Sequence, residues 1–259
     1  MPYLELNHAA VEYEQAGTGA DVLLLHSLLT EMSVFDAIWP QLTRAFRVTR
    51  VNLPGYGRSM PRALHGVADY ASHVAQVMDE LQLPRTTCVF GNGFGAFVAV
   101  MLALRQGTRF GKLIVADVVA AFPEPARVPF RLMSQKVTES GMSAILDVAI
   151  GRMFPPGFAA AQPHEVALRK AALAQADAAS FSRACQALAA LDMSAELKII
   201  TNPTLVLCGA LDQTTPPALA RALAEGIPGA RYAEIAGSGH CPMVEQPETL
   251  VEQLKAFAG

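Results

Sequence analysis

Short, mostly apolar runs recur along the chain and alternate with longer amphipathic stretches. Runs of four or five residues with few charges are typical of strands that are buried on both faces of a sheet. Two apolar segments near the start, Leu4–Asn7 and Val11–Tyr13, predict an opening hairpin. The buried strands are predicted at Val22–Leu25, Val48–Val51, Thr87–Phe90, Leu113–Ala116, Thr204–Cys208 and Tyr232–Ile235.

Two stretches between these runs have the pattern of helices. Apolar residues recur every three or four positions between Val67 and Leu81, which predicts an amphipathic helix. The segment from Phe94 to Leu104 is apolar on all sides, which predicts a helix buried in the core. Strands that alternate with helices predict an α/β fold in which helices flank a mostly parallel sheet.

The alternation stops after Ala116 and resumes near Pro203. The intervening stretch contains several prolines and alanine-rich helical segments, and no run in it resembles the buried strands. We therefore expect a helical cap at residues 118–200, inserted into a core formed by residues 1–117 and 201–259.

The composition excludes several classes of protein. Hydrophobic residues make up 52% of the 259 residues, which is too many for a disordered chain. Twenty lysines and arginines against 23 aspartates and glutamates give a net charge of −3. Nucleic-acid binding and a polybasic membrane anchor are not expected, because both need an excess of positive charge.

An uncharged run of 19 residues, Thr86–Leu104, has the length of a membrane span. Its centre holds three alternate glycines, Gly91, Gly93 and Gly95, which favour a strand, a sharp turn and a buried helix over one long helix. The start, Met1–Glu5, has no basic or apolar segment typical of a signal peptide. No membrane association is therefore expected.

The cysteines predict an intracellular protein without a zinc site. The chain has four cysteines, none of them in a CxxC spacing, and no export signal. A cytoplasmic location and no metal or organic cofactor are therefore expected. The oligomeric state is left open, and a homodimer is compatible with the sequence.

Three loops that carry candidate chemistry each follow a predicted strand. The turn Gly91–Gly95, called the elbow here, follows the strand that ends at Phe90. Asp212 follows the strand that ends at Cys208, and His240 follows the strand that ends at Ile235. Because the carboxyl ends of parallel strands share one edge of the sheet, these loops should meet there.

Alternative interpretations exist for His240 and Asp212. His240 could be a structural histidine, although a Gly-Ser-Gly-His segment placed after a strand favours a role in a site. Asp212 could cap the helix that begins near Pro216. Asp117, at the end of another strand, is a rival for the role of the acid.

The order of elbow, acid and histidine resembles the α/β-hydrolase fold, whose triad runs serine, acid, histidine. The resemblance covers nearly the whole chain. His26-Ser27-Leu28 corresponds to the oxyanion loop, and residues 52–59 resemble the family's DxPGxGxS segment with asparagine first. Segments 141–144, 153–155 and 203–217 are similar to the 3-oxoadipate enol-lactonase group. The resemblance implies a small ester, lactone or related carbonyl compound as the substrate.

The resemblance also suggests which groups surround that substrate. The backbone N–H groups of Leu28 and Phe94 are expected to form the oxyanion hole. Three arginines of the insertion, Arg127, Arg131 and Arg152, could meet a substrate carboxylate, but solvated surface positions are favoured. The expected substrate pocket includes Ser27, Phe130, Met133 and Met153, although the last three could equally form the core of the insertion.

The chain departs from the family at the most important position. Gly93 stands where the family's G-x-S-x-G elbow has its nucleophilic serine, so no acyl-enzyme can form there. Glycine suits the strained, positive φ that this position requires. Ser27 and Cys241 are alternative nucleophiles with weak support from the sequence.

Three interpretations of Gly93 stay open on the sequence alone. In the favoured one, His240, oriented by Asp212, is a general base that activates water in the space left by the serine. In the second, the chain is a non-catalytic module that binds a small ligand. In the third, a serine esterase or enol-lactonase has been inactivated by a change from serine to glycine.

Overall fold

A computed structural model describes residues 3–6 and 9–259 of the protein. Within these residues, eight strands form one sheet in the order β1-β2-β4-β3-β5-β6-β7-β8. All six predicted strands and the opening hairpin are present, although Asn7 of the hairpin lies outside the described residues. The last strand, predicted at Tyr232–Ile235, lies at the edge of the sheet, and only its final residue is buried. The strands are β1 (Tyr3–Leu6), β2 (Ala9–Ala16), β3 (Asp21–Leu25), β4 (Arg47–Val51), β5 (Cys88–Asn92), β6 (Lys112–Ala116), β7 (Thr204–Gly209) and β8 (Arg231–Ile235).

The sheet is mostly parallel, as the sequence predicts. Strands β3 to β8 run parallel to one another, whereas β2 is antiparallel to both β1 and β4 at one edge of the sheet. In the centre, Leu24 of β3 faces Phe90 of β5, which faces Ile114 of β6. Every residue of β3, β5 and β7 is buried, which explains why their sequences are apolar on both faces apart from one polar residue at an end of each strand.

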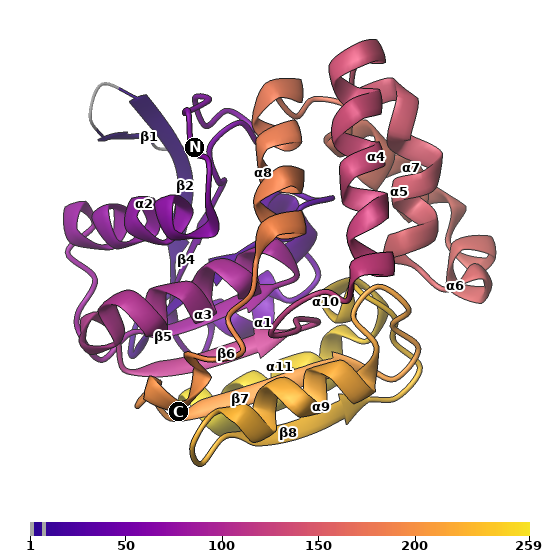
Figure 1. Ribbon diagram of the computed structural model, residues 1–259. Coiled ribbons are helices and arrows are strands. Elements are labelled where there is room, and N and C mark those ends of the chain that lie inside the picture. The colour runs from indigo at the N-terminus through magenta and orange to yellow at the C-terminus, as the bar shows by residue number, and fades with distance from the viewer. Residues whose placement is uncertain (1–2, 7–8) are drawn as a thin grey trace.

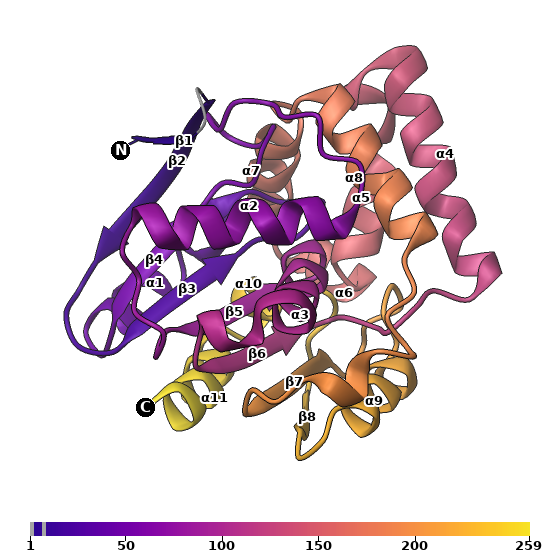
Figure 2. The same cartoon turned by 60° about the vertical axis from the view of Figure 1, so that its left-hand side comes forward.

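Helices cover both faces of this sheet. Helices α2 and α3 lie on one face and α11 on the other (Figures 1 and 2). The amphipathic helix predicted from Val67 is α2, and the helix predicted from Phe94 is α3, which is buried from its first residue to Leu104. The helices of the core are α1 (Trp39–Thr43), α2 (Val67–Glu80), α3 (Phe94–Gln106), α9 (Pro217–Gly226), α10 (Pro242–Glu245) and α11 (Pro247–Ala258).

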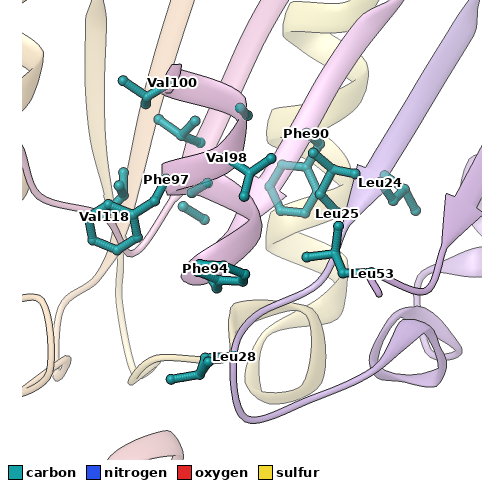
Figure 3. Close-up of a cluster of buried hydrophobic side chains, with 14 of the residues drawn as sticks. Leu24, Leu25, Leu28, Leu53, Phe90, Phe94, Phe97, Val98, Val100 and Val118 are labelled. Carbon is teal, nitrogen blue, oxygen red and sulfur yellow. The ribbon is translucent and has the colours of Figure 1, made fainter. Parts of the chain in front are cut away.

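The core is centred on helix α3, where it packs on β3 and β5. Figure 3 shows Phe90 between Val98 of α3 and Leu24 of β3. Phe90, Leu24 and Val98 have no exposed surface. Burial of each such side chain contributes about 1.5–3 kcal/mol to folding. The uncharged run is therefore a strand, a turn and a core helix. No helix among the described residues is both long and apolar enough to cross a membrane.

The predicted helical insertion lies between β6 and β7. It contains α4 (Glu124–Ser140) and a cap-like group formed by α5 (Leu146–Met153), α6 (Pro156–Ala161), α7 (Pro163–Leu173) and α8 (Ala178–Ala190). Helix α4 packs along α8, beside the sheet (Figures 1 and 2). The boundaries at residues 118 and 200 stay a prediction. Four 3₁₀ helices complete the described elements: Met32–Phe35, Gly107–Arg109, Met142–Ile145 and Leu197–Ile199.

Candidate active site

The elbow joins β5 to α3 through a strained turn that glycine makes possible. Gly93 has φ +50° and ψ −118°, so the positive φ expected from the sequence is confirmed. A methyl group on Gly91 would overlap the backbone of Gly95, and one on Gly95 would overlap the backbone of Leu25. The outer glycines thus permit close packing of helix and strand, whereas the central one permits the backbone conformation.

His240 and Asp212 are brought together at the carboxyl ends of the strands. Nδ1 of His240 lies 2.8 Å from Oδ2 of Asp212, and both residues are buried. Because the carboxylate can only accept, Nδ1 carries the hydrogen, which leaves Nε2 of the neutral ring as an acceptor. Asp212 also accepts hydrogen bonds from the backbone N–H groups of Thr214 and Thr215 and from the Thr215 hydroxyl. These four hydrogen bonds fix the carboxylate against the imidazole.

Asp117, the rival acid, occupies a different position. Its carboxylate accepts hydrogen bonds from the N–H of Gly209 at 2.9 Å and from the side-chain amide of Asn92 at 2.8 Å. It adopts φ +59°, which is unusual for a residue other than glycine. The geometry therefore favours Asp212 over Asp117 as the partner of His240.

Asp117, Asp212 and His240 also form the candidate metal group among the described residues. One ligand atom from each lies within 4.8 Å of the others. However, hydrogen bonds from protein N–H and hydroxyl groups already engage both carboxylates, and Nδ1 of His240 donates to Asp212. This arrangement favours a hydrogen-bonded acid–histidine pair over metal ligation.

The charges in this cluster separate the pKa values of its three members. Burial lowers the pKa of His240, but the charge of Asp212 and its hydrogen bond outweigh burial and raise that pKa above 6.5. Burial opposes ionisation of Asp212 as well, yet the charge of His240 and the hydrogen bonds to Asp212 lower its pKa to about 2. Burial and the charge of Asp212 raise the pKa of Asp117 well above its ordinary value. An ionised Asp212 beside a titratable His240 is the arrangement that a general base requires.

We expect the pKa of His240 in the folded protein to lie above 6.5 and to fall in the Asp212→Asn variant, because the neutral amide no longer favours the imidazolium. Titration of the ring hydrogens by NMR measures both values. His26 is the internal control, since burial lowers its pKa to about 4 and it does not contact Asp212.

The raised pKa of His240 also makes the stability of the fold depend on pH. A histidine whose pKa is raised by folding stabilises the fold fully below its unfolded pKa of about 6.5, and this contribution is lost as the pH rises through the folded pKa. A pKa of His240 below 6.5, or one that is the same in the Asp212→Asn variant, would contradict this electrostatic coupling.

His240 lines a small cavity beneath the insertion, and its Nε2 lies on the side of Gly93, which also lines this cavity. The space in it that is open to water is about 20 Å³. Three of the predicted pocket residues, Ser27, Phe130 and Met133, line it, whereas Met153 lines a neighbouring cavity of about 80 Å³ beside His240 and Asp212. The complete lining of the first cavity is Ser27, Leu28, Leu29, Gly93, Phe94, Phe97, Phe122, Phe130, Met133, Arg152, Leu188, Thr214, Thr215 and His240.

The predicted oxyanion donors also reach this cavity. Phe94 lies at the lower end of α3 with Leu28 below it (Figure 3), and both line the cavity wall. Among the described residues, the backbone N–H groups of Leu28 and Phe94 have no hydrogen-bond acceptor. Two unsatisfied N–H groups beside a free imidazole nitrogen can stabilise negative charge on a carbonyl oxygen.

Surface positions are predicted for Arg127, Arg131 and Arg152, and the structure contradicts this prediction for Arg152 alone. Arg127 and Arg131 form ion pairs with Glu124, at 3.9 and 2.5 Å. Arg152 instead lines the cavity, with its guanidinium 5.3 Å from the centre of the Phe130 ring. Within the described residues it forms no ion pair. No local pattern distinguishes the three arginines, so only the packing of α5 reveals the difference.

Comparison with known proteins agrees with this fold. Residues 22–253 match the alpha/beta hydrolase family, so the chain belongs to that family. It is 29% identical to 3-oxoadipate enol-lactonase 2 of Acinetobacter baylyi, over 97% of this chain and 92% of the relative. It is also 26% identical to a pimeloyl-[acyl-carrier protein] methyl ester esterase of Nitrosomonas europaea, over 96% of this chain and 100% of the relative.

A solved structure supports the same assignment. The crystal structure of the enol-lactonase from Burkholderia xenovorans LB400 superposes with a TM-score of 0.92, at 26% sequence identity and over 99% of both chains. The relatives are thus esterases and lactonases, which are hydrolases.

Proposed function

We propose that the protein hydrolyses a small carboxylic ester or lactone, with His240 as the general base and Asp212 as its orienting partner. The observation that carries this proposal is the free Nε2 of His240, which opens into the same cavity as the N–H groups of Leu28 and Phe94. A base beside two unsatisfied donors suits attack of water on a carbonyl group.

In the proposed reaction, water replaces the serine that the family carries at the elbow. Nε2 of His240 takes a proton from the water as its oxygen bonds to the carbonyl carbon. The carbonyl oxygen becomes negative and accepts hydrogen bonds from the N–H groups of Leu28 and Phe94. The intermediate then breaks the bond to the leaving oxygen, which receives the proton from His240, while ionised Asp212 stabilises the imidazolium in between.

The small volume of the cavity implies movement on substrate binding. A space of about 20 Å³ accommodates a single water molecule and no ester. Phe130 and Met133 of α4 and Arg152 of α5 form its wall on the side of the insertion. We infer that these side chains move aside to admit the substrate. Arg152 forms no ion pair among the described residues, although the charge of Asp212 acts on it, and its guanidinium favours a substrate that carries a carboxylate.

The decisive experiment is turnover by the purified chain of short acyl esters and of an enol-lactone, each with and without a carboxylate. We expect slow turnover that starts without a burst, because no acyl-enzyme forms at Gly93, and faster turnover of the carboxylate-bearing member of each pair.

Two outcomes would contradict the proposed hydrolysis by water. Ligand binding without any turnover would indicate a non-catalytic binding protein. Turnover that appears only when serine is restored at position 93 would indicate an inactivated serine hydrolase.

A further inference from the structure

The space beside Gly93 is partly filled by the side chain of Ser27. A methyl group added at Gly93 would overlap the Ser27 hydroxyl and would stand 3.0 Å from Nε2 of His240. The Ser27 hydroxyl and this nitrogen therefore approach the same point, which is where the side chain of a nucleophilic serine would begin. Ser27 belongs to the loop after β3, far from the elbow in sequence.

The backbone of Ser27 is held in place from several sides. Its N–H donates to Oγ1 of Thr30 at 3.1 Å, and its carbonyl oxygen accepts from Nδ1 of His26 at 2.8 Å. The other ring nitrogen of His26 accepts from the N–H of Leu53 at 3.0 Å. His26 is fully buried, and its pKa is lowered to about 4 by that burial, so the ring stays neutral and keeps this arrangement.

The hydroxyl of Ser27, by contrast, is left without a partner. Only 2% of the residue is exposed, yet Oγ forms no hydrogen bond with any described residue, His240 included. Oγ is not among the fully buried side-chain atoms that lack a partner, so a water in the cavity that Ser27 lines can reach it. The cavity onto which Ser27 opens has room for about one water molecule.

We propose that Ser27 holds the hydrolytic water against His240. This inference rests on the proposed function, and Ser27 is a positioning residue in it. The water donates one hydrogen to Nε2 of His240 and the other to Oγ of Ser27, so that its lone pairs remain free for the carbonyl carbon. The first hydrogen moves to Nε2 as the carbon–oxygen bond forms, and Ser27 gains and loses no bond. Ser27 thereby compensates for the missing side chain at Gly93.

The kinetic test is the Ser27→Ala variant. We expect kcat to fall about tenfold, the effect of one lost hydrogen bond to the attacking water, with KM unchanged because Ser27 is not needed for substrate binding. Ser27→Thr, which keeps a hydroxyl, should recover part of the loss. The matched control is Ser182→Ala, which removes a buried hydroxyl that bonds to Ser134 in the insertion.

Failure of this inference and failure of the proposed function give different results in the Ser27→Ala and His240→Ala variants. An unchanged kcat in Ser27→Ala overturns the role of Ser27, whereas unchanged turnover in His240→Ala overturns the proposed function itself. A fluorophosphonate adduct or an acyl group on the peptide that contains Ser27, detected by mass spectrometry, would make Ser27 the nucleophile and reject the water-holding role.

A structural measurement tests the inference without turnover. A high-resolution crystal structure should show an ordered water within hydrogen-bonding distance of both Ser27 Oγ and His240 Nε2. A direct hydrogen bond between these two atoms, with no water between them, would overturn the inference.

Discussion

Replacing His240 with alanine is expected to lower kcat/KM for the best ester or lactone by about 10²–10⁴-fold, the usual contribution of a general base. The imidazole is the group in the cavity whose free nitrogen can take a proton from water, and its pKa lies above 6.5 because Asp212 stabilises the charged ring. Activity of the unchanged protein should therefore increase as the pH rises through that pKa, since only the neutral imidazole accepts the proton. Initial rates measured across the pH range test both statements.

The control for this variant must separate chemistry from folding. Loss of His240 leaves the buried carboxylate of Asp212 without its charged partner, which destabilises the fold. Urea denaturation of His240→Ala, compared with His65→Ala at an exposed histidine, shows whether the lost activity reflects unfolding. A folded His240→Ala protein that keeps its rate would reject His240 as the base.

Restoring serine at position 93 is expected to create a covalent route only when Ser27 is also reduced to glycine. In Gly93→Ser alone, the new side chain overlaps Ser27 and sits at φ +50°, so the free energy of unfolding should fall by about 1–3 kcal/mol. The double variant Gly93→Ser/Ser27→Gly removes the overlap. It also places the new side chain beside Nε2 of His240 and the N–H groups of Leu28 and Phe94.

The double variant should increase kcat on the order of 10²-fold or more, because loss of the nucleophilic serine from a full triad lowers kcat by considerably more than this factor. It should also show a burst of product and an acyl-enzyme at position 93. Stopped-flow kinetics and mass spectrometry of the intact protein measure these quantities. The matched comparison is Ser27→Gly alone, which should show neither a burst nor an adduct. A double variant without an acyl-enzyme would mean that His240 and the two N–H groups are not arranged for acyl transfer.

Several parts of this molecule follow from local sequence. Continuously apolar runs such as Val22–Leu25 are buried on both faces of the sheet, and β3 forms where that pattern predicts it. Gly91, Gly93 and Gly95 can be interpreted without a structure because each satisfies a backbone requirement, either close packing or a positive φ. Asp212 and His240 could be paired from their positions after two parallel strands, because the carboxyl ends of those strands share one edge.

Other parts could not be predicted from any local pattern. Arg152 resembles Arg127 and Arg131 in sequence, yet it alone of the three lines the cavity. The sequence predicts Met153 beside Phe130 in one pocket, whereas the structure has it in the neighbouring cavity. Both outcomes depend on how the helices of the insertion are oriented over the sheet, which periodicity does not encode.

The sequence by itself determined the α/β fold, the strained elbow and the lack of a side-chain nucleophile at Gly93, and it favoured Asp212 over Asp117 as the partner of His240. Each of these depends on residue type, periodicity or position relative to a strand. Only the tertiary structure decided that the Ser27 hydroxyl fills the space beside Gly93 and that the remaining cavity holds about one water. The physical reason is that Ser27, Gly93 and His240 come from three loops far apart in the chain, and their separation is set by the packing of the whole sheet edge.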